Sequence, residues 1–134
     1  PLDIDRRMHA VTVFRDLPAA ASLAAANKRI GNILKKVEGK LATKIDTKIF
    51  QDDAEKALYE QLTTLDTKVQ SDIDKGDYQA ALTELANLRD NIDLFFEQVM
   101  VMADDPSLQN NRIAMLNRLH GLFMQVADIS RLQN

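Results

Sequence analysis

The sequence predicts an all-α protein, a helical bundle of five to six helices in a single domain over residues 1–134. Only four glycines and three prolines interrupt the 134 residues, which favours long helices over many short strands. Apolar residues recur at steps of three and four, as on the buried face of a helix, and no period of two persists beyond a few residues. A chain of this length has enough material for one hydrophobic core.

Two helices are expected in the first third of the chain. Residues 1–16 are predicted to form a lead-in helix. A second helix begins at Pro18, since proline suits the first turn of a helix, and runs to about Val37. The apolar face of this second helix consists of Leu23, Ala26, Ile30, Ile33, Leu34 and Val37.

A loop over residues 39–51 leads to a third predicted helix. Asp52 and Asp53 are suitable caps for its first turn. Lys75-Gly76-Asp77 then indicates a helix end, a turn and a new cap. Between these signals lies one apolar stripe, made of Ala54, Leu58, Leu62, Leu65, Val69 and Ile73.

The fourth predicted helix begins at Tyr78, and we expect it to kink or restart near Asp90-Asn91, because the apolar pattern continues beyond that point to Met102. Asp104-Asp105-Pro106 ends this run and opens the last helix, which is predicted to reach about Ala127.

Charge is distributed unevenly along the chain. The net charge is −3, but residues 28–48 hold seven Lys/Arg and two acids, a local charge of +5. Residues 52–105 hold four Lys/Arg and fourteen acids, a local charge of −10. A chain polarised in this way can present one basic face to an anion, although chance clustering on solvated helix faces explains the pattern equally well.

Several kinds of chemistry have no support in the sequence. The absence of cysteine excludes disulfides and thiolate metal sites and suits a reducing cytoplasm. The glycines are too dispersed for a phosphate-binding loop, and His9 and His120 lie far apart. No apolar run reaches the ~20 residues that span a bilayer. We expect no catalytic residue, no metal and no cofactor in this domain, a cytoplasmic location and no membrane partner. Because Pro1 replaces an initiator methionine, we expect a piece of a longer polypeptide.

Two features suggest where a ligand would bind. The side of the second helix opposite its apolar face is basic and carries Lys28, Asn32 and Lys35, flanked by Arg29 and Lys36. This face is either an RNA-binding surface or a basic helix face that contacts only solvent. Arg112 falls within the apolar stripe of the last helix, where a charge must be paired or open onto a polar pocket. Pairing is favoured, for example with Asp93.

Three blocks of the sequence, residues 24–36, 93–105 and 111–130, resemble in order and spacing the C-terminal region of the β subunit of bacterial glycyl-tRNA synthetases. The resemblance covers roughly residues 18–133. It implies an anticodon-binding helical bundle shared with arginyl-tRNA synthetases and named after an Asp-Ala-Leu-Arg motif. Leu88-Arg89-Asp90-Asn91 occupies the comparable stretch, so the literal motif is absent.

The resemblance also implies a function. The domain would recognise the anticodon of glycine tRNA, in which the last two bases are cytosine. The α subunit would carry out ATP-dependent glycine activation, in an α₂β₂ assembly with the rest of the β subunit. The residues implied in RNA binding lie within the matched blocks: Asn27, Lys28, Arg29, Asn32, Lys35, Lys36, Asn111 and Arg112.

Two alternatives remain. The first is a helical docking module of the same subunit with little RNA contact, which would expose a large apolar patch instead of a basic, amide-bearing concavity. The second is the equivalent domain of an arginyl enzyme, which the Val99-Met100-Val101-Met102 block and the closing residues 126–130 disfavour.

Overall fold

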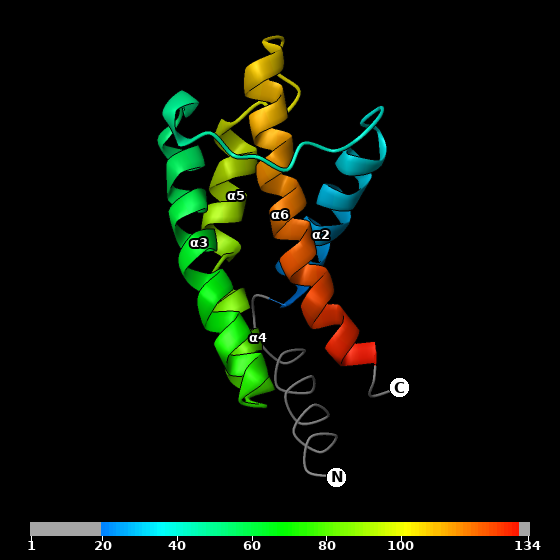
Figure 1. Ribbon diagram of the computed structural model, residues 1–134, viewed down its shortest axis with the longest axis vertical. Coiled ribbons are helices and arrows are strands. Elements are labelled where there is room, and N and C mark those ends of the chain that lie inside the picture. Colours follow the sequence, from blue (N-terminus) through cyan, green and yellow to red (C-terminus); the bar gives the residue numbers. More distant parts are fainter. Residues whose placement is uncertain (1–19, 132–134) are drawn as a thin grey trace.

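The structure is a computed structural model that describes residues 20–131 (Figure 1). No strand occurs in this range, and the predicted all-α class is confirmed. The elements are α2 (Ala20–Lys35), the 3-10 turn η1 (Thr47–Ile49), α3 (Asp53–Asp74), α4 (Tyr78–Ala86), α5 (Arg89–Gln98) and α6 (Pro106–Arg131).

Along one long axis, α2, α3, the α4–α5 pair and α6 run in alternating directions, and α4 and α5 run the same way (Figure 1). Helices α4 and α5 are separated only by Asn87 and Leu88 and both pack against α3, so the described part of the chain forms 4 helical rods. Counted in this way, residues 20–131 have slightly fewer helices than the predicted five to six. The lead-in helix predicted for residues 1–16 lies outside the described residues.

The interruption between α4 and α5 has a polar partner on α3. The carbonyl oxygen of Asn87, which a continuous helix would bond to a later amide, accepts a hydrogen bond from the side chain of Gln61 at 2.8 Å. Asn91 in turn donates to the side-chain oxygen of Gln61 at 2.6 Å. The predicted kink therefore exists, but it lies three residues before the expected Asp90.

The core consists of the predicted apolar faces. The stripe of α3 is buried except at Ile73, which is partly buried. At the end of α3, Gly76 has a φ of 75°, which glycine adopts without steric cost, and Asp77 caps α4 by accepting from the Ala80 amide. The turn predicted there is confirmed. None of the described helices is long and apolar enough to cross a membrane.

The loop between α2 and α3 crosses the N-terminal part of α6 (Figure 1), and two side chains of α6 hold it in place. Asn111 exchanges two hydrogen bonds with the backbone of Asp46: its oxygen accepts from the amide at 2.7 Å and its amide donates to the carbonyl at 3.0 Å. This pair of bonds reproduces the pairing of a sheet ladder and fixes the middle of the loop on α6.

Arg112 fixes the end of the same loop. Its Nη2 donates to the Glu55 carboxylate at 3.1 Å and to the side chain of Gln51 at 3.3 Å, while Nη1 donates to the Met100 carbonyl oxygen at 2.6 Å. Glu55 also accepts from the amides of Gln51 and Asp52, and so satisfies the start of α3. Both charged side chains are buried, Arg112 being 3% exposed and Glu55 fully buried.

The predicted pairing of Arg112 is confirmed, but the suggested partner is wrong. Asp93 lies on α5 next to Arg89, at 3.9 Å, and the carboxylate that meets Arg112 comes from α3. Periodicity located the buried charge, but it could not identify the neighbouring helix.

Replacing Arg112 with alanine would leave the Glu55 carboxylate buried without its cation. We expect the free energy of unfolding to fall by about 3–5 kcal/mol, measured by urea denaturation followed by circular dichroism. The matched control is Arg118→Ala, because Arg118 pairs with Asp66 at 3.3 Å near the surface, where an ion pair contributes about 0–1 kcal/mol. Equal losses in the two variants would contradict the buried bridge.

Candidate nucleic-acid interface

Helix α2 packs against both α5 and α6 and has a concave surface beside each of them. The α2–α6 groove has a volume of about 560 Å³. Its walls carry two lysines and several amides and include no carboxylate. The lining residues are Asn27, Lys28, Gly31, Asn32, Leu34, Lys35, Leu41, Asn117, His120 and Met124.

Four of the predicted RNA-binding residues share the α2–α6 groove. Lys28, Asn32 and Lys35 are exposed along one side of α2, and Asn27 is half-buried beside them. Their steps of three, four and one residues place them on adjacent rows of the helix surface. The groove therefore combines cations with neutral hydrogen-bonding groups on a rigid element.

Two polar residues of the groove were missed at the sequence level. His120 Nδ1 lies 3.0 Å from Asn27 Oδ1, and Asn117 is one turn earlier on α6. With the proton on Nδ1, the imidazole donates to Asn27 and its Nε2 is an acceptor. Spacing on α6 was the available signal, because Asn117 and His120 flank the apolar stripe, but the packing of α6 against α2 appears only in the structure.

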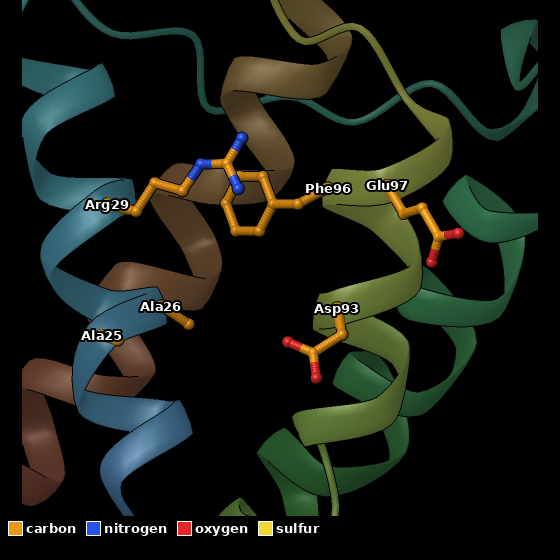
Figure 2. Close-up of a pocket in the computed structure, with 6 residues that line it drawn as sticks. All are labelled: Ala25, Ala26, Arg29, Asp93, Phe96 and Glu97. Atoms are coloured by element: carbon orange, nitrogen blue, oxygen red, sulfur yellow. The ribbon is translucent and has the colours of Figure 1, made fainter.

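The α2–α5 pocket lies on the other flank of α2 and has a volume of about 440 Å³ (Figure 2). The guanidinium of Arg29 is stacked over the Phe96 ring, 4.1 Å from its centroid, which is the geometry of a cation–π contact. Ala25 and Ala26 form the α2 wall, and Asp93 and Glu97 contribute carboxylates from α5. Arg29 is thus separated from the other basic residues and belongs to a mixed-charge site.

The other predicted site residues lie elsewhere. Lys36 is exposed just beyond the end of α2 and lines neither concave surface. Asn111 and Arg112 are buried, each 3% exposed, and hold the loop between α2 and α3. The structure therefore gives these two residues positions beneath the loop, away from both flanks of α2.

The loop that Asn111 and Arg112 hold is itself basic. Lys40, Lys44 and Lys48 are exposed along it. Because the loop begins at the end of α2 and crosses α6, it extends the positive charge beyond the α2–α6 groove (Figure 1). Between residues 20 and 131, no group of three or more His, Asp or Glu side chains could hold a metal ion.

The fold and the groove define a class of protein: an all-α bundle domain with a cationic, amide-bearing groove. The family model for the DALR anticodon binding domain matches residues 23–129. The chain belongs to this family.

Curated relatives match the chain along nearly its whole length. The chain is 58% identical over 133 residues to the glycine–tRNA ligase beta subunit of Aeromonas salmonicida (strain A449) and 53% identical over 133 residues to that of Vibrio parahaemolyticus serotype O3:K6. Each match covers 99% of this chain and 19% of the relative. The chain thus spans about a fifth of the length of these relatives.

Gly31 offers a test of the groove geometry. A Cβ added there would meet His120 Cε1 at 3.7 Å, an ordinary van der Waals contact. We expect Gly31→Ala to raise the free energy of unfolding by about 0.5–1 kcal/mol, because alanine is the better helix former. Gly121→Ala on α6 is the control, since nothing lies within 4 Å of its added Cβ. A loss of stability at Gly31 with a gain at Gly121 would mean that α2 and α6 lie closer together.

Proposed function

We propose that this domain binds the anticodon loop of glycine tRNA. The α2–α6 groove carries the proposal: Lys28 and Lys35 supply cations for backbone phosphates, and the amides of Asn27, Asn32 and Asn117 supply donors and acceptors. Contacts to phosphates position a nucleic acid, and contacts to base edges give specificity. Family membership and the names of the relatives support the same substrate.

The charge distribution favours RNA binding on the α2 side of the bundle. Lys40, Lys44 and Lys48 lie on the loop that follows α2, so their field adds to that of the groove lysines. The acid-rich stretch, residues 52–105, forms α3, α4 and α5. A polyanion is therefore attracted to the α2 side of the bundle and repelled from the α3 side.

The alternative function, a docking module, has less support. Among the described residues, the exposed large hydrophobic side chains are Met100 and Met102, which are 71% and 50% exposed. Both belong to the turn between α5 and α6, and two methionines fall short of the contiguous apolar patch that a protein interface needs. The basic, amide-bearing groove is the feature expected of an RNA-binding module.

The wider assignment follows the relatives. We propose that the domain serves a cytoplasmic glycine–tRNA ligase, in which the α subunit uses ATP to activate glycine and the rest of the β subunit completes tRNA recognition. In this arrangement the domain contributes no catalytic group and no cofactor. Its task is to select the tRNA by the anticodon, far from the amino acid, in an α₂β₂ assembly.

Removing the groove cations should weaken RNA binding in a salt-dependent way. In the double variant Lys28→Gln, Lys35→Gln we expect the slope of log affinity against log salt concentration to become shallower by about 0.7 for each lost phosphate contact. The affinities are measured by fluorescence anisotropy with a labelled anticodon hairpin of glycine tRNA at several salt concentrations. Lys68→Gln, which removes one exposed lysine from α3, is the control and should leave the slope unchanged. A slope that responds equally to Lys68→Gln would place RNA binding elsewhere.

Replacing both anticodon cytosines of glycine tRNA should weaken its binding to the native domain. For each base that the domain contacts we expect a loss of about 1–3 kcal/mol, because a mismatched base leaves its protein partners unpaired. The measurement compares the affinities of the native tRNA transcript and of the transcript with both cytosines replaced, at one salt concentration. Equal affinities would show that this domain holds the tRNA without recognising its anticodon.

A further inference from the structure

The α2–α5 pocket differs from the groove on the other flank of α2 in its charge. It contains one cation, Arg29, and the carboxylates of Asp93 and Glu97, whereas the groove has lysines and no acid. We infer that this pocket binds an unstacked nucleobase by an edge that carries an exocyclic amino group. The inference rests on the proposed function, because it requires an RNA loop lying across α2.

Arg29 and Phe96 provide a flat surface in the pocket. One face of the guanidinium covers the half-buried Phe96 ring at 4.1 Å, and the side chain of Arg29 is exposed. None of the hydrogen bonds or ion pairs within residues 20–131 engages the guanidinium, so its N–H donors are free to bind a ligand in its plane. The Phe96 ring thus holds the guanidinium in one plane, in which its N–H donors can meet the edge of a base.

Asp93 supplies the acceptor. Its carboxylate points from α5 into the space below Arg29 and Phe96, opposite Ala25 and Ala26 (Figure 2). Its pairing with Arg89, at 3.9 Å, is loose, and the side chain of Asp93 is 60% exposed. The small alanines leave the room into which a planar ligand enters. Glu97 lines the same pocket, with its carboxylate turned away from Arg29 (Figure 2).

A carboxylate beside a guanidinium selects against phosphate and in favour of a neutral ligand with both donors and acceptors. Cytosine offers an amino donor at C4 next to acceptors at N3 and O2, which match Asp93 and Arg29 respectively. Uracil has a carbonyl oxygen in place of the amino group, and this oxygen would face the Asp93 carboxylate. The pocket therefore distinguishes the two pyrimidines by charge and by hydrogen bonding.

The two flanks of α2 then bind different parts of the RNA, phosphates in the α2–α6 groove and a base in the α2–α5 pocket. They are separated by the width of one helix, about 10 Å, so one RNA loop can place phosphates beside Lys28 and Lys35 and a base beside Arg29. The groove supplies affinity that depends on salt, and the pocket supplies discrimination between bases.

The decisive experiment uses the complete 134-residue chain and anticodon hairpins of glycine tRNA in which each cytosine in turn is replaced by uracil. We expect the native chain to prefer the cytosine hairpin by about 5- to 150-fold at one position. In Asp93→Asn this preference should collapse toward equal affinity, because an amide can rotate to donate to uracil O4 as readily as it accepts from cytosine. Asp90→Asn is the matched control: it removes the same charge from an exposed position of α5 outside the pocket and should keep the native preference.

A second variant tests the space rather than the charge. Ala25→Leu, at an exposed position of α2, fills the mouth of the pocket and should abolish the preference for cytosine. The inference is overturned if Asp93→Asn and Ala25→Leu both keep the native preference, or if the native chain binds the hairpins without preference. In either case, a salt-dependent loss of binding in the double variant Lys28→Gln, Lys35→Gln would still support RNA binding by α2. No binding by the native chain at low salt would overturn the inference and the proposed function together.

Discussion

The buried guanidinium of Arg112 constrains the bundle because a charge withdrawn from water must find its partners nearby. It bonds to Glu55 at the start of α3, to Gln51 at the end of the preceding loop and to the Met100 carbonyl after α5. Two segments that are distant in the sequence, residues 51–55 and the turn after α5, therefore meet at one point of α6. Compared with apolar packing, a buried ion pair contributes little net stability, and Glu55 Oε2 and Arg112 Nε have no hydrogen-bond partner among the described residues. We interpret the bridge as a device that specifies which segments come together.

The position of the loop has a functional consequence through its lysines. Because the Asn111 bonds to Asp46 and the Arg112 bond to Gln51 fix the loop across α6, the backbone that carries the exposed Lys44 and Lys48 is held in place. A phosphate-binding surface made of preorganised cations loses less entropy on binding than one made of a mobile loop. Two residues that the family resemblance suggested as RNA contacts thus act on the proposed RNA surface from beneath it.

The sequence predicts the fold better than the site, for a physical reason. Local patterns determine helices: the α3 stripe follows the helical period, and the turn at Gly76 follows from glycine's tolerance of positive φ. A groove between two helices depends on which helices are neighbours, and no local pattern encodes that. Asn117 and His120 could therefore not be assigned to the face of Lys28, and the partner of Arg112 was sought on the wrong helix. The family match supports the proposed substrate, but it does not supply these contacts.

Carboxylates on a surface proposed to bind RNA need an explanation, because each one repels the phosphate backbone. The six acids of α3 avoid the conflict, and Glu84 of α4 and Asp90 of α5 line neither concave surface of α2. Asp93 and Glu97 do not avoid it, because both line a pocket with Arg29 on the α2 side, and the carboxylate of Asp93 points into that pocket (Figure 2). Its negative charge lowers the affinity for any polyanion, so it is useful only where the ligand presents a hydrogen-bond donor. A nucleobase amino group is such a donor and a phosphate is not. The lysines of the groove offset this repulsion of the phosphates. The net charge of −3 is therefore compatible with RNA binding, because the cations that attract phosphates lie on one flank of α2 and the pocket proposed to discriminate between bases lies on the other.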